Sequence, residues 1–189
     1  LRQDLVAARE EMKRDALTDA YNRGAFDIAI TQSVNMHFIM QQPVTLMMVD
    51  LDNFKEINDS LGHTAGDEVL RAIVDGLARS FIRKSDFVAR YGGDEFAVIL
   101  TDTPALHCEP LIERFLEHAR NIRVSAAPDE ALVACSVGYT EIAEGDTVAE
   151  LVKRADQALY RAKARGRDQA VFLAASDNGE SLESGRQSA

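Results

Sequence analysis

The sequence predicts an α/β (α+β) fold, with a mostly antiparallel central sheet of about five strands flanked by helices and preceded by an N-terminal helical stalk. Helical spacings of apolar residues alternate with short apolar runs along the chain. The pair Gly92-Gly93 separates two such runs, as in an antiparallel hairpin, and we expect both glycines to adopt positive φ angles. A length of 189 residues allows one domain with appendages.

The first segment, Leu1–Arg14, is rich in charge and carries a heptad-like apolar spacing. The spacing covers only two heptads, so a coiled-coil stalk and a terminal helix folded back on its own domain are equal alternatives. Because the chain begins without Met, we expect residues 1–14 to link it to an upstream sensory domain. The domain itself is expected over 15–174, and a disordered, polar tail over 175–189.

The remaining elements follow from apolar periodicity and from proline punctuation. Spacings of three and four predict helices, and short continuous apolar runs predict buried strands. In chain order we expect a helix over Asn22–Gln41, a strand over Val44–Val49, helices over Asn53–Leu61 and Ala65–Phe81, strands over Phe87–Tyr91 and Phe96–Leu100, a helix from Pro104 to about Arg123, a strand over Leu132–Thr140, a helix over Val148–Ala164 and a strand over Ala170–Leu173.

Composition excludes several classes of function. The 21 Lys and Arg against 31 Asp and Glu give a net charge of −10, which disfavours a nucleic-acid groove and docking on an anionic membrane. Apolar runs fall far short of the roughly 20 residues of a membrane-spanning helix. Two cysteines without zinc-ligand spacing fit a reducing compartment, so we expect a cytoplasmic domain.

Two groups of carboxylates occupy strand positions that can meet. Asp50 and Asp52 end one apolar run, and Asp94 and Glu95 lie in the hairpin. Carboxylates beside an apolar sheet are costly unless a positive charge lies between them, and Mg²⁺ prefers such oxygen ligands. The alternative is that these acids are solvated turn residues.

The segment Asn53-Phe54-Lys55 begins a helix directly after these acids. A helix start presents backbone N–H groups, and with the lysine it offers a good environment for phosphate. The chain has no GxxxxGK[ST] motif, so it is not a P-loop protein. Metal carboxylates beside such a helix start favour a nucleoside triphosphate as the ligand.

At this point the motifs carry a family resemblance. The segment Arg90-Tyr91-Gly92-Gly93-Asp94-Glu95-Phe96 resembles the signature of the GGDEF family, the diguanylate cyclases. The resemblance covers about Asp15 to Phe172. Its other blocks are Asp15-Ala16-Leu17-Thr18 with Asn22-Arg23, Asp50-Leu51-Asp52-Asn53-Phe54-Lys55-Glu56-Ile57-Asn58-Asp59, Gly62-His63 with Gly66-Asp67, and Ala158-Leu159-Tyr160-Arg161-Ala162-Lys163 with Gly166-Arg167.

The resemblance implies condensation of two GTP into cyclic di-GMP and two pyrophosphates, with one GTP held by each protomer of a homodimer. It implies Mg²⁺ as the cofactor, with Mn²⁺ as an open alternative. Asp50 and Asp94 would be side-chain metal ligands, and Leu51 would contribute its carbonyl. Asp94 would also accept the proton of the 3′-hydroxyl. Glu95 would be a supporting acid, and Lys55 would stabilise charge in the transition state.

The resemblance also assigns the contacts to the nucleotide. Asn58 and Asp67 would read guanine, and a polar site of that kind can discriminate by about 10⁴ to 10⁵. Lys163 and Arg167 would hold the triphosphate, although cations in a last helical turn also suit the helix dipole. The full substrate-binding set is Asn58, Asp67, Phe54, Gly92, Gly93, Lys163 and Arg167.

One further pattern precedes the hairpin. Arg83 and Asp86 form an RxxD that resembles the family's product-inhibition site, and Arg with Asp suits a guanine edge. The plain alternative is a surface ion pair. Arg114 is a candidate for a secondary product site. The competing function is a non-catalytic cyclic di-GMP receptor that uses only the RxxD.

Overall fold

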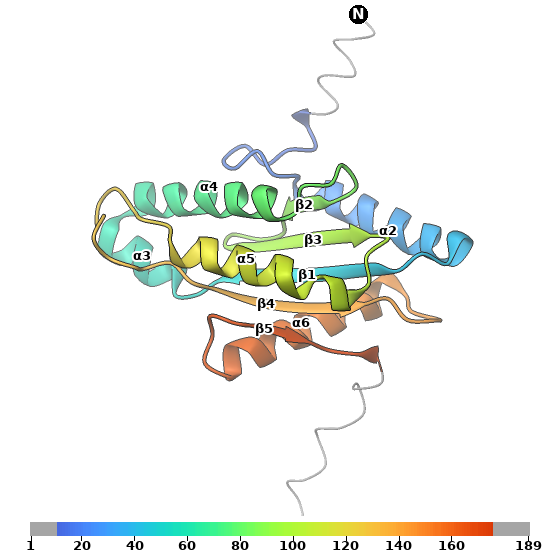
Figure 1. The fold of residues 1–189 in the computed structure, drawn as a ribbon. Helices are drawn as coiled ribbons and strands as arrows, with labels where there is room; N and C mark the ends of the chain where they lie inside the picture. Colours follow the sequence, from blue (N-terminus) through green and yellow to red (C-terminus); the bar gives the residue numbers. More distant parts are fainter. Residues whose placement is uncertain (1–10, 176–189) are drawn as a thin grey trace, which may run out of the picture.

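The computed structural model describes residues 11–175 and confirms the expected mixed fold (Figure 1). The sheet has the order β2-β3-β1-β4-β5, and only the β4–β5 pair is parallel. Most of the expected stalk over 1–14 and nearly all of the expected tail lie outside the described residues. The strands are β1 (Val44–Leu51), β2 (Phe87–Arg90), β3 (Glu95–Thr101), β4 (Cys135–Glu141) and β5 (Ala170–Phe172).

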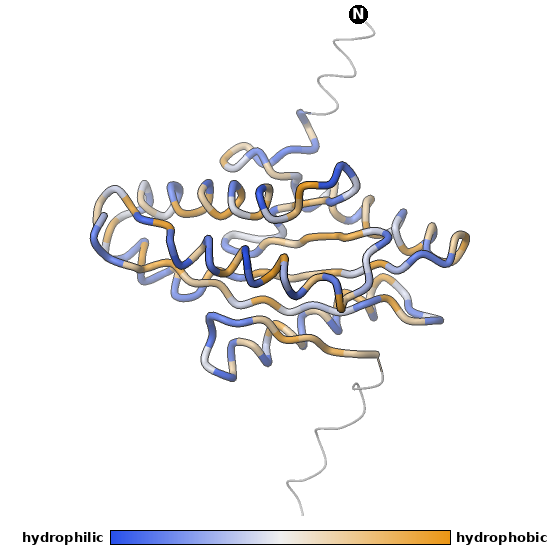
Figure 2. The backbone as a smooth tube through the Cα atoms, in the orientation of Figure 1, coloured by the Kyte–Doolittle hydropathy of each residue, from blue (hydrophilic) through white to orange (hydrophobic). Residues whose placement is uncertain are grey.

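Helices cover both faces of this sheet. β1 is buried along its whole length, and its side chains alternate between two cores. Met47 and Val49 belong to the core under α4 and α5, whereas Leu46 and Met48 belong to the core under α2 and α6. In Figure 2 the apolar colour follows the inner strands. The helices are α2 (Arg23–Met40), α3 (Phe54–Leu61), α4 (His63–Ser80), the 3-10 helix η1 (Ala105–His107), α5 (Glu109–Arg120) and α6 (Val148–Ala164).

Two of the expected elements have different bounds in the structure. The helix expected from Pro104 is split into η1 and α5. Pro110 lacks a backbone N–H and is unfavourable inside a helix, so it stands in the first turn of α5. The strand expected from Leu132 begins at Cys135, the residue paired with the last residue of β1. Residues before it have no strand beside them in that register.

The hairpin between β2 and β3 corrects our expectation about its glycines. Neither Gly92 nor Gly93 has a positive φ angle. The connection runs over residues 91–94, and the N–H groups of Tyr91 and Gly92 both donate to the carbonyl of Glu95 at 2.8 and 3.1 Å. A four-residue loop does not need the left-handed conformations that a two-residue hairpin requires. A Cβ on Gly92 would stand 2.8 Å from Glu95 Oε2, so a larger residue there would displace the end of the Glu95 side chain.

α6 lies directly on β4. A Cβ on Gly138 would collide with the backbone of α6 at Ala155 and Leu159, so only glycine permits this approach. The helix begins with a capping box between Thr147 and Glu150, which fixes its first turn. These contacts set the height of α6 over the sheet, and its last turn carries Lys163.

Candidate functional site

The predicted metal residues come together where β1 meets the hairpin. Asp50 is the register partner of Glu95, and the N–H of Leu51 donates to the carbonyl of Asp94 at 3.2 Å. Strand pairing therefore brings the Asp94 backbone against Leu51 and sets Glu95 opposite Asp50. Sequence reasoning predicted this meeting from two separate motifs, and the register of the β1–β3 pair explains it.

The electrostatics of this cluster favour a cation. Burial raises the pKa of the Asp50 carboxyl, the Lys163 ammonium opposes that rise, and the negative charges of Asp94 and Glu95 add to it. Lys163 Nζ lies 3.0 Å from Asp50 Oδ1, so it is the basic group that partly balances the acids. Lys163 therefore lies against Asp50, one of the expected metal ligands.

The donor set fits one kind of divalent ion. Within residues 11–175, no three side chains of His, Cys, Asp or Glu are grouped so that they could hold a metal by themselves. Mg²⁺ is usually bound by one or two carboxylates, with substrate phosphates and water completing its octahedral shell. Asp50, Asp94 and the Leu51 carbonyl are hard oxygen ligands of that kind and fit an ion that arrives with a triphosphate.

Asp52 does not belong to this cluster, contrary to the first grouping of acids by sequence. Its carboxylate is buried and accepts hydrogen bonds from Ser136 Oγ at 2.7 Å and from the N–H of Asp168 at 3.0 Å. Asp52 therefore joins the end of β1 to β4 and to the loop after α6. Its partner Asp168 is 116 residues away in sequence, which is why the motif alone did not reveal this role.

The expected guanine side is formed by α3 and α4. A Cβ on Gly66 would collide with Asn58 Oδ1 and stand 3.1 Å from the ring of Phe54. Gly66 therefore allows Asn58 and Phe54 of α3 to pack against α4, next to Asp67. Sequence reasoning noted Gly66 only as part of a motif and missed this function. Lys55 is exposed on α3, one residue after the helix begins.

The other expected phosphate contact, Arg167, is exposed in the loop after α6, and its N–H donates to the carbonyl of Ala162 at 3.1 Å. Arg90, which was not predicted as a site residue, braces the hairpin. Its guanidinium donates to the Gly93 carbonyl at 2.7 and 3.1 Å and to Asp15 Oδ1 at 3.1 Å. The bend that carries Asp94 is thus connected through Arg90 to Asp15.

The RxxD residues lie at a separate turn, where they bind each other. Arg83 Nη2 is 2.8 Å from Asp86 Oδ1, and the Arg83 N–H donates to Asp86 Oδ2 at 3.0 Å. Arg83 also donates to the side chain of Thr103. Arg114 donates to the Ser80 carbonyl at 2.6 Å, near the end of α4. Both arginines therefore have partners within the chain, and a guanine ligand would have to compete with them.

Comparison with known proteins shows the family of the chain. The family described as "Diguanylate cyclase, GGDEF domain" matches residues 12–169. The chain belongs to the GGDEF family. The response regulator PleD of Caulobacter vibrioides is 38% identical over 178 residues, which cover 93% of this chain and 39% of PleD. The diguanylate cyclase DgcP of Pseudomonas aeruginosa is 39% identical over 166 residues, which cover 85% of this chain and 24% of DgcP.

Solved GGDEF structures have the same fold. The coiled coil and GGDEF domain of DgcB from Caulobacter crescentus, in complex with c-di-GMP, matches with a TM-score of 0.86 and 29% identity over 91% of each chain. The diguanylate cyclase SiaD of Pseudomonas aeruginosa, in complex with its activator SiaC, matches with a TM-score of 0.84 and 35% identity over 91% of this chain and 66% of SiaD. In residues 11–175, no helix is both long and apolar enough to cross a bilayer.

The family also occurs in a protein named for the opposite activity. The cyclic di-GMP phosphodiesterase NbdA of Pseudomonas aeruginosa is 35% identical over 169 residues, which cover 89% of this chain and 21% of NbdA. This chain spans less than half of each of these curated relatives. The family name therefore describes the domain, and the activity of the whole protein needs its own argument.

Proposed function

We propose that this GGDEF domain is a diguanylate cyclase that condenses two GTP into cyclic di-GMP and two pyrophosphates across a homodimer. The observation that carries the proposal is the pairing of β1 with the hairpin, which sets Asp50 opposite Glu95 and the Asp94 backbone against Leu51. The name of DgcP and the c-di-GMP bound to DgcB are consistent with this activity.

The chemistry assigned to this site is a nucleotidyl transfer. The 3′-hydroxyl oxygen of one GTP attacks the α-phosphorus of the other, a new P–O bond forms, and pyrophosphate leaves with its bonding electrons. A bound Mg²⁺ would supply positive charge at the phosphates, held by Asp50, Asp94 and the Leu51 carbonyl. Asp94 takes the hydroxyl proton and Glu95 supports it. Two reciprocal transfers close the ring.

The remaining residues bind and orient the nucleotide. Asn58 and Asp67 read guanine beside the Phe54 ring, and the lack of side chains at Gly92 and Gly93 gives the nucleotide access to the bend. Lys55, Lys163 and Arg167 neutralise the triphosphate, and Lys55 also stabilises the charge that develops during transfer. The local charge is favourable despite the acidic total of −10. The contacting cations are Lys55, Lys163 and Arg167.

A test of turnover uses purified chain, freed of bound product, with GTP and Mg²⁺ at high protein concentration. We expect cyclic di-GMP to form, with a rate that rises more steeply than linearly with protein concentration, because each protomer holds one of the two reacting nucleotides. Asp94→Asn should abolish it. Asp102→Asn is the matched control, since Asp102 is an exposed acid just beyond the far end of β3. Equal absence of product from the unmodified chain and from Asp94→Asn would overturn the proposal.

We also propose that product inhibits the enzyme at Arg83 and Asp86. The Arg83 side chain is 44% exposed while it contacts Asp86, so its guanidinium is accessible to a guanine edge. A forked guanidinium matches guanine O6 and N7, and a carboxylate accepts from N1–H. Inhibition of the initial rate by added cyclic di-GMP, lost in Arg83→Ala, tests this assignment.

The second candidate is a non-catalytic cyclic di-GMP receptor. The relative NbdA, which is named as a phosphodiesterase, indicates that a related domain occurs in a protein that is not named for synthesis. Such a receptor would bind cyclic di-GMP through Arg83 and Asp86 without turning over GTP. Titration calorimetry with GTP and with cyclic di-GMP separates the two, because the cyclase must bind both and the receptor only the second. The two free cysteines, Cys108 and Cys135, are buried and fit a cytoplasmic domain of either kind.

A further inference from the structure

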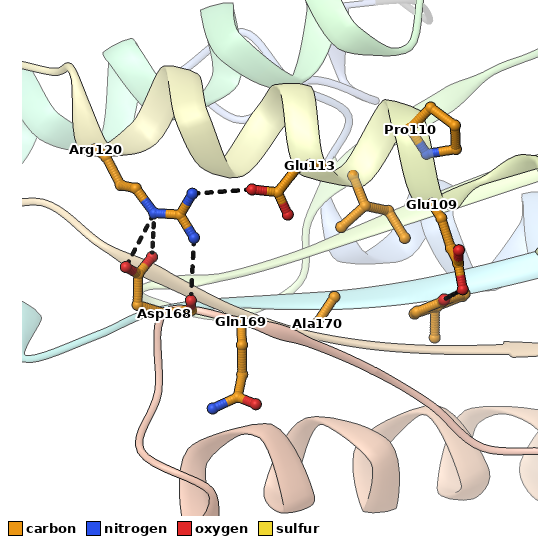
Figure 3. Close-up of a pocket in the computed structure, with 9 residues that line it drawn as sticks. Glu109, Pro110, Glu113, Arg120, Asp168, Gln169 and Ala170 are labelled. Carbon is orange, nitrogen blue, oxygen red and sulfur yellow. Dashed lines mark hydrogen bonds and ion pairs between the residues drawn. The ribbon is translucent and has the colours of Figure 1, made fainter.

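Arg120, the last residue of α5, contacts Asp168 in the loop that follows α6 (Figure 3). Its Nε lies 2.9 Å from each carboxylate oxygen of Asp168, and its Nη2 donates to the Asp168 carbonyl at 3.2 Å. Its Nη1 donates to Glu113 Oε1 at 3.0 Å. One guanidinium thus fixes both the side chain and the backbone of Asp168, the residue after Arg167.

Asp168 also contacts the residue that follows β1, the strand that carries the expected metal ligands Asp50 and Leu51. The N–H of Asp168 donates to Asp52 Oδ2 at 3.0 Å, and the other carboxylate oxygen of Asp52 accepts from Ser136 at 2.7 Å. Asp52 is 4% exposed and directly follows Leu51, the expected carbonyl ligand. A continuous set of hydrogen bonds therefore runs from Arg120 through Asp168 to the end of β1.

The backbone of this loop has an unfavourable conformation that contacts with the rest of the chain must maintain. Gly166, Arg167 and Asp168 have φ angles of 114°, 66° and 46°, so three consecutive residues are left-handed. A non-glycine residue pays about 1–2 kcal/mol for that conformation, and such strain persists only where surrounding contacts impose it. The contacts to Asp168 supply that constraint.

The exposure of the Arg120–Asp168 ion pair indicates that it contributes little to the stability of the fold. The two side chains are 37% and 43% exposed. Ion pairs with such exposure contribute only about 0–1 kcal/mol to stability. The pair also borders a cavity of about 500 Å³ lined by Glu109, Tyr139 and Gln169 among others, so tight packing does not hold the loop on this side.

We propose that Arg120 is a positioning residue for GTP: through Asp168 it holds Arg167 where the triphosphate binds. Arg120 does not touch the substrate in this proposal and acts only through the loop. The inference rests on the proposed function, because it takes Arg167 as a triphosphate contact. It adds a residue from α5, an element to which the proposed mechanism assigns no part.

The test is a double-mutant cycle on GTP. Arg120→Gln should raise the KM for GTP by about tenfold while kcat changes far less, because misplacement of a binding group weakens substrate binding. Arg120→Lys should be intermediate, since an ammonium lacks the guanidinium fork. In an Arg167→Ala background, Arg120→Gln should add almost nothing, because the residue through which it acts is already gone.

The matched control is Glu113→Gln, which removes the other carboxylate partner of Arg120 but leaves the Asp168 contacts. We expect its KM to stay within about twofold of the unmodified chain. Equilibrium binding of a GTP analogue that resists transfer should follow the same order of variants. Thermal unfolding, followed in parallel, should shift little in any of them. If Arg120→Gln does not fold, Arg120→Lys carries the same comparison.

The outcomes separate the two claims. A KM increase of the same size with and without Arg167 would overturn the positioning role while leaving the cyclase intact. So would an unchanged KM in Arg120→Gln and Arg120→Lys. Absence of both GTP binding and cyclic di-GMP formation by the unmodified chain would overturn the proposed function, and this inference with it.

Discussion

Two acid-bearing turns differ in how their charges are balanced. The first is the hairpin turn between β2 and β3, which lies beside the end of β1, and the second is the turn that precedes β2. At the end of β1, the Asp50 carboxylate faces Asp94 and Glu95 with Lys163 as its cationic partner. At the turn before β2, the Asp86 side chain is 2% exposed and has both oxygens bonded to Arg83. At the second turn, Arg83 already supplies the positive charge and the hydrogen-bond donors that Asp86 needs.

The difference in charge balance determines where a bound ligand would relieve the most unfavourable charge. Burial raises the pKa of Asp50, so the folded chain holds its carboxylate at a cost that a cation would relieve. The Arg83–Asp86 turn gains nothing from a free cation and can accept a ligand only by exchanging existing contacts. We therefore expect metal to act at the first turn, and a ligand at the second to bind by substitution.

We expect the greatest loss of activity when the Asp50 carboxylate beside the first turn is removed. Asp50→Asn should lower the rate of cyclic di-GMP formation by at least about 10³-fold, because an amide is a poor Mg²⁺ ligand and binds less well than a carboxylate. The rate is measured from pyrophosphate release at saturating GTP and Mg²⁺. Asp102→Asn is again the control for an acid at a distant position. A variant that keeps one tenth of the activity would show that Asp50 is not a metal ligand.

The next effect tests the second turn as a ligand site. Arg83→Ala should weaken binding of cyclic di-GMP by about 10–100-fold, since a forked contact to guanine is worth about 1–3 kcal/mol. Titration calorimetry with cyclic di-GMP measures this. Lys84→Ala, at the neighbouring exposed position, is the matched control and should retain the affinity. Equal affinities for the two variants would remove the RxxD from the ligand site.

A smaller effect compares the two turns in stability. Asp86→Ala should lower the free energy of unfolding by about 1–3 kcal/mol, because it leaves the Arg83 guanidinium and backbone N–H without a charged acceptor. Urea unfolding at neutral pH measures the change. Asp59→Ala, an exposed residue in α3, should be within about 0.5 kcal/mol of the unmodified chain. A loss no larger than that control would mean that the Arg83–Asp86 pair does not stabilise the turn.

The smallest expected change is a gain in stability, whereas the preceding variant loses stability. A raised pKa means that the fold favours protonated Asp50, so its contribution to stability is full at low pH and is lost as pH rises through the raised pKa. Asp50→Asn removes that loss. Its melting temperature without metal should exceed that of the unmodified chain by a few degrees at neutral pH, with the gap closing toward pH 3.8 and below. A gap that is constant with pH would contradict this origin.

The sequence predicted the elements that depend on local patterns. All five strands and the helices over α2, α3, α4 and α6 are confirmed within a few residues, because apolar spacing and prolines determine them. The meeting of Asp50 with the hairpin was also predictable from the two motifs. The individual roles of the site residues stay predictions, as do the domain bounds.

What could not be predicted depends on contacts between distant parts of the chain. The roles of Asp52 and Arg120 arise from hydrogen bonds to Asp168, which is 116 and 48 residues away from them. The glycines of the hairpin were assigned the wrong conformation because the turn length, set by the β2–β3 register, was not known. The space that Gly66 leaves for Asn58 likewise exists only once α3 and α4 are packed.

Gly138 in β4 lets the backbone of α6 lie directly on the sheet. The height of α6, and with it the reach of the Lys163 ammonium over Asp50, is set by the atoms that Gly138 lacks. A single added methyl group at Gly138 would push α6 away from β4 and would move Lys163, in the last turn of α6, relative to Asp50. The charge balance around Asp50 therefore depends partly on an uncharged residue of β4 that makes no side-chain contact with the acids.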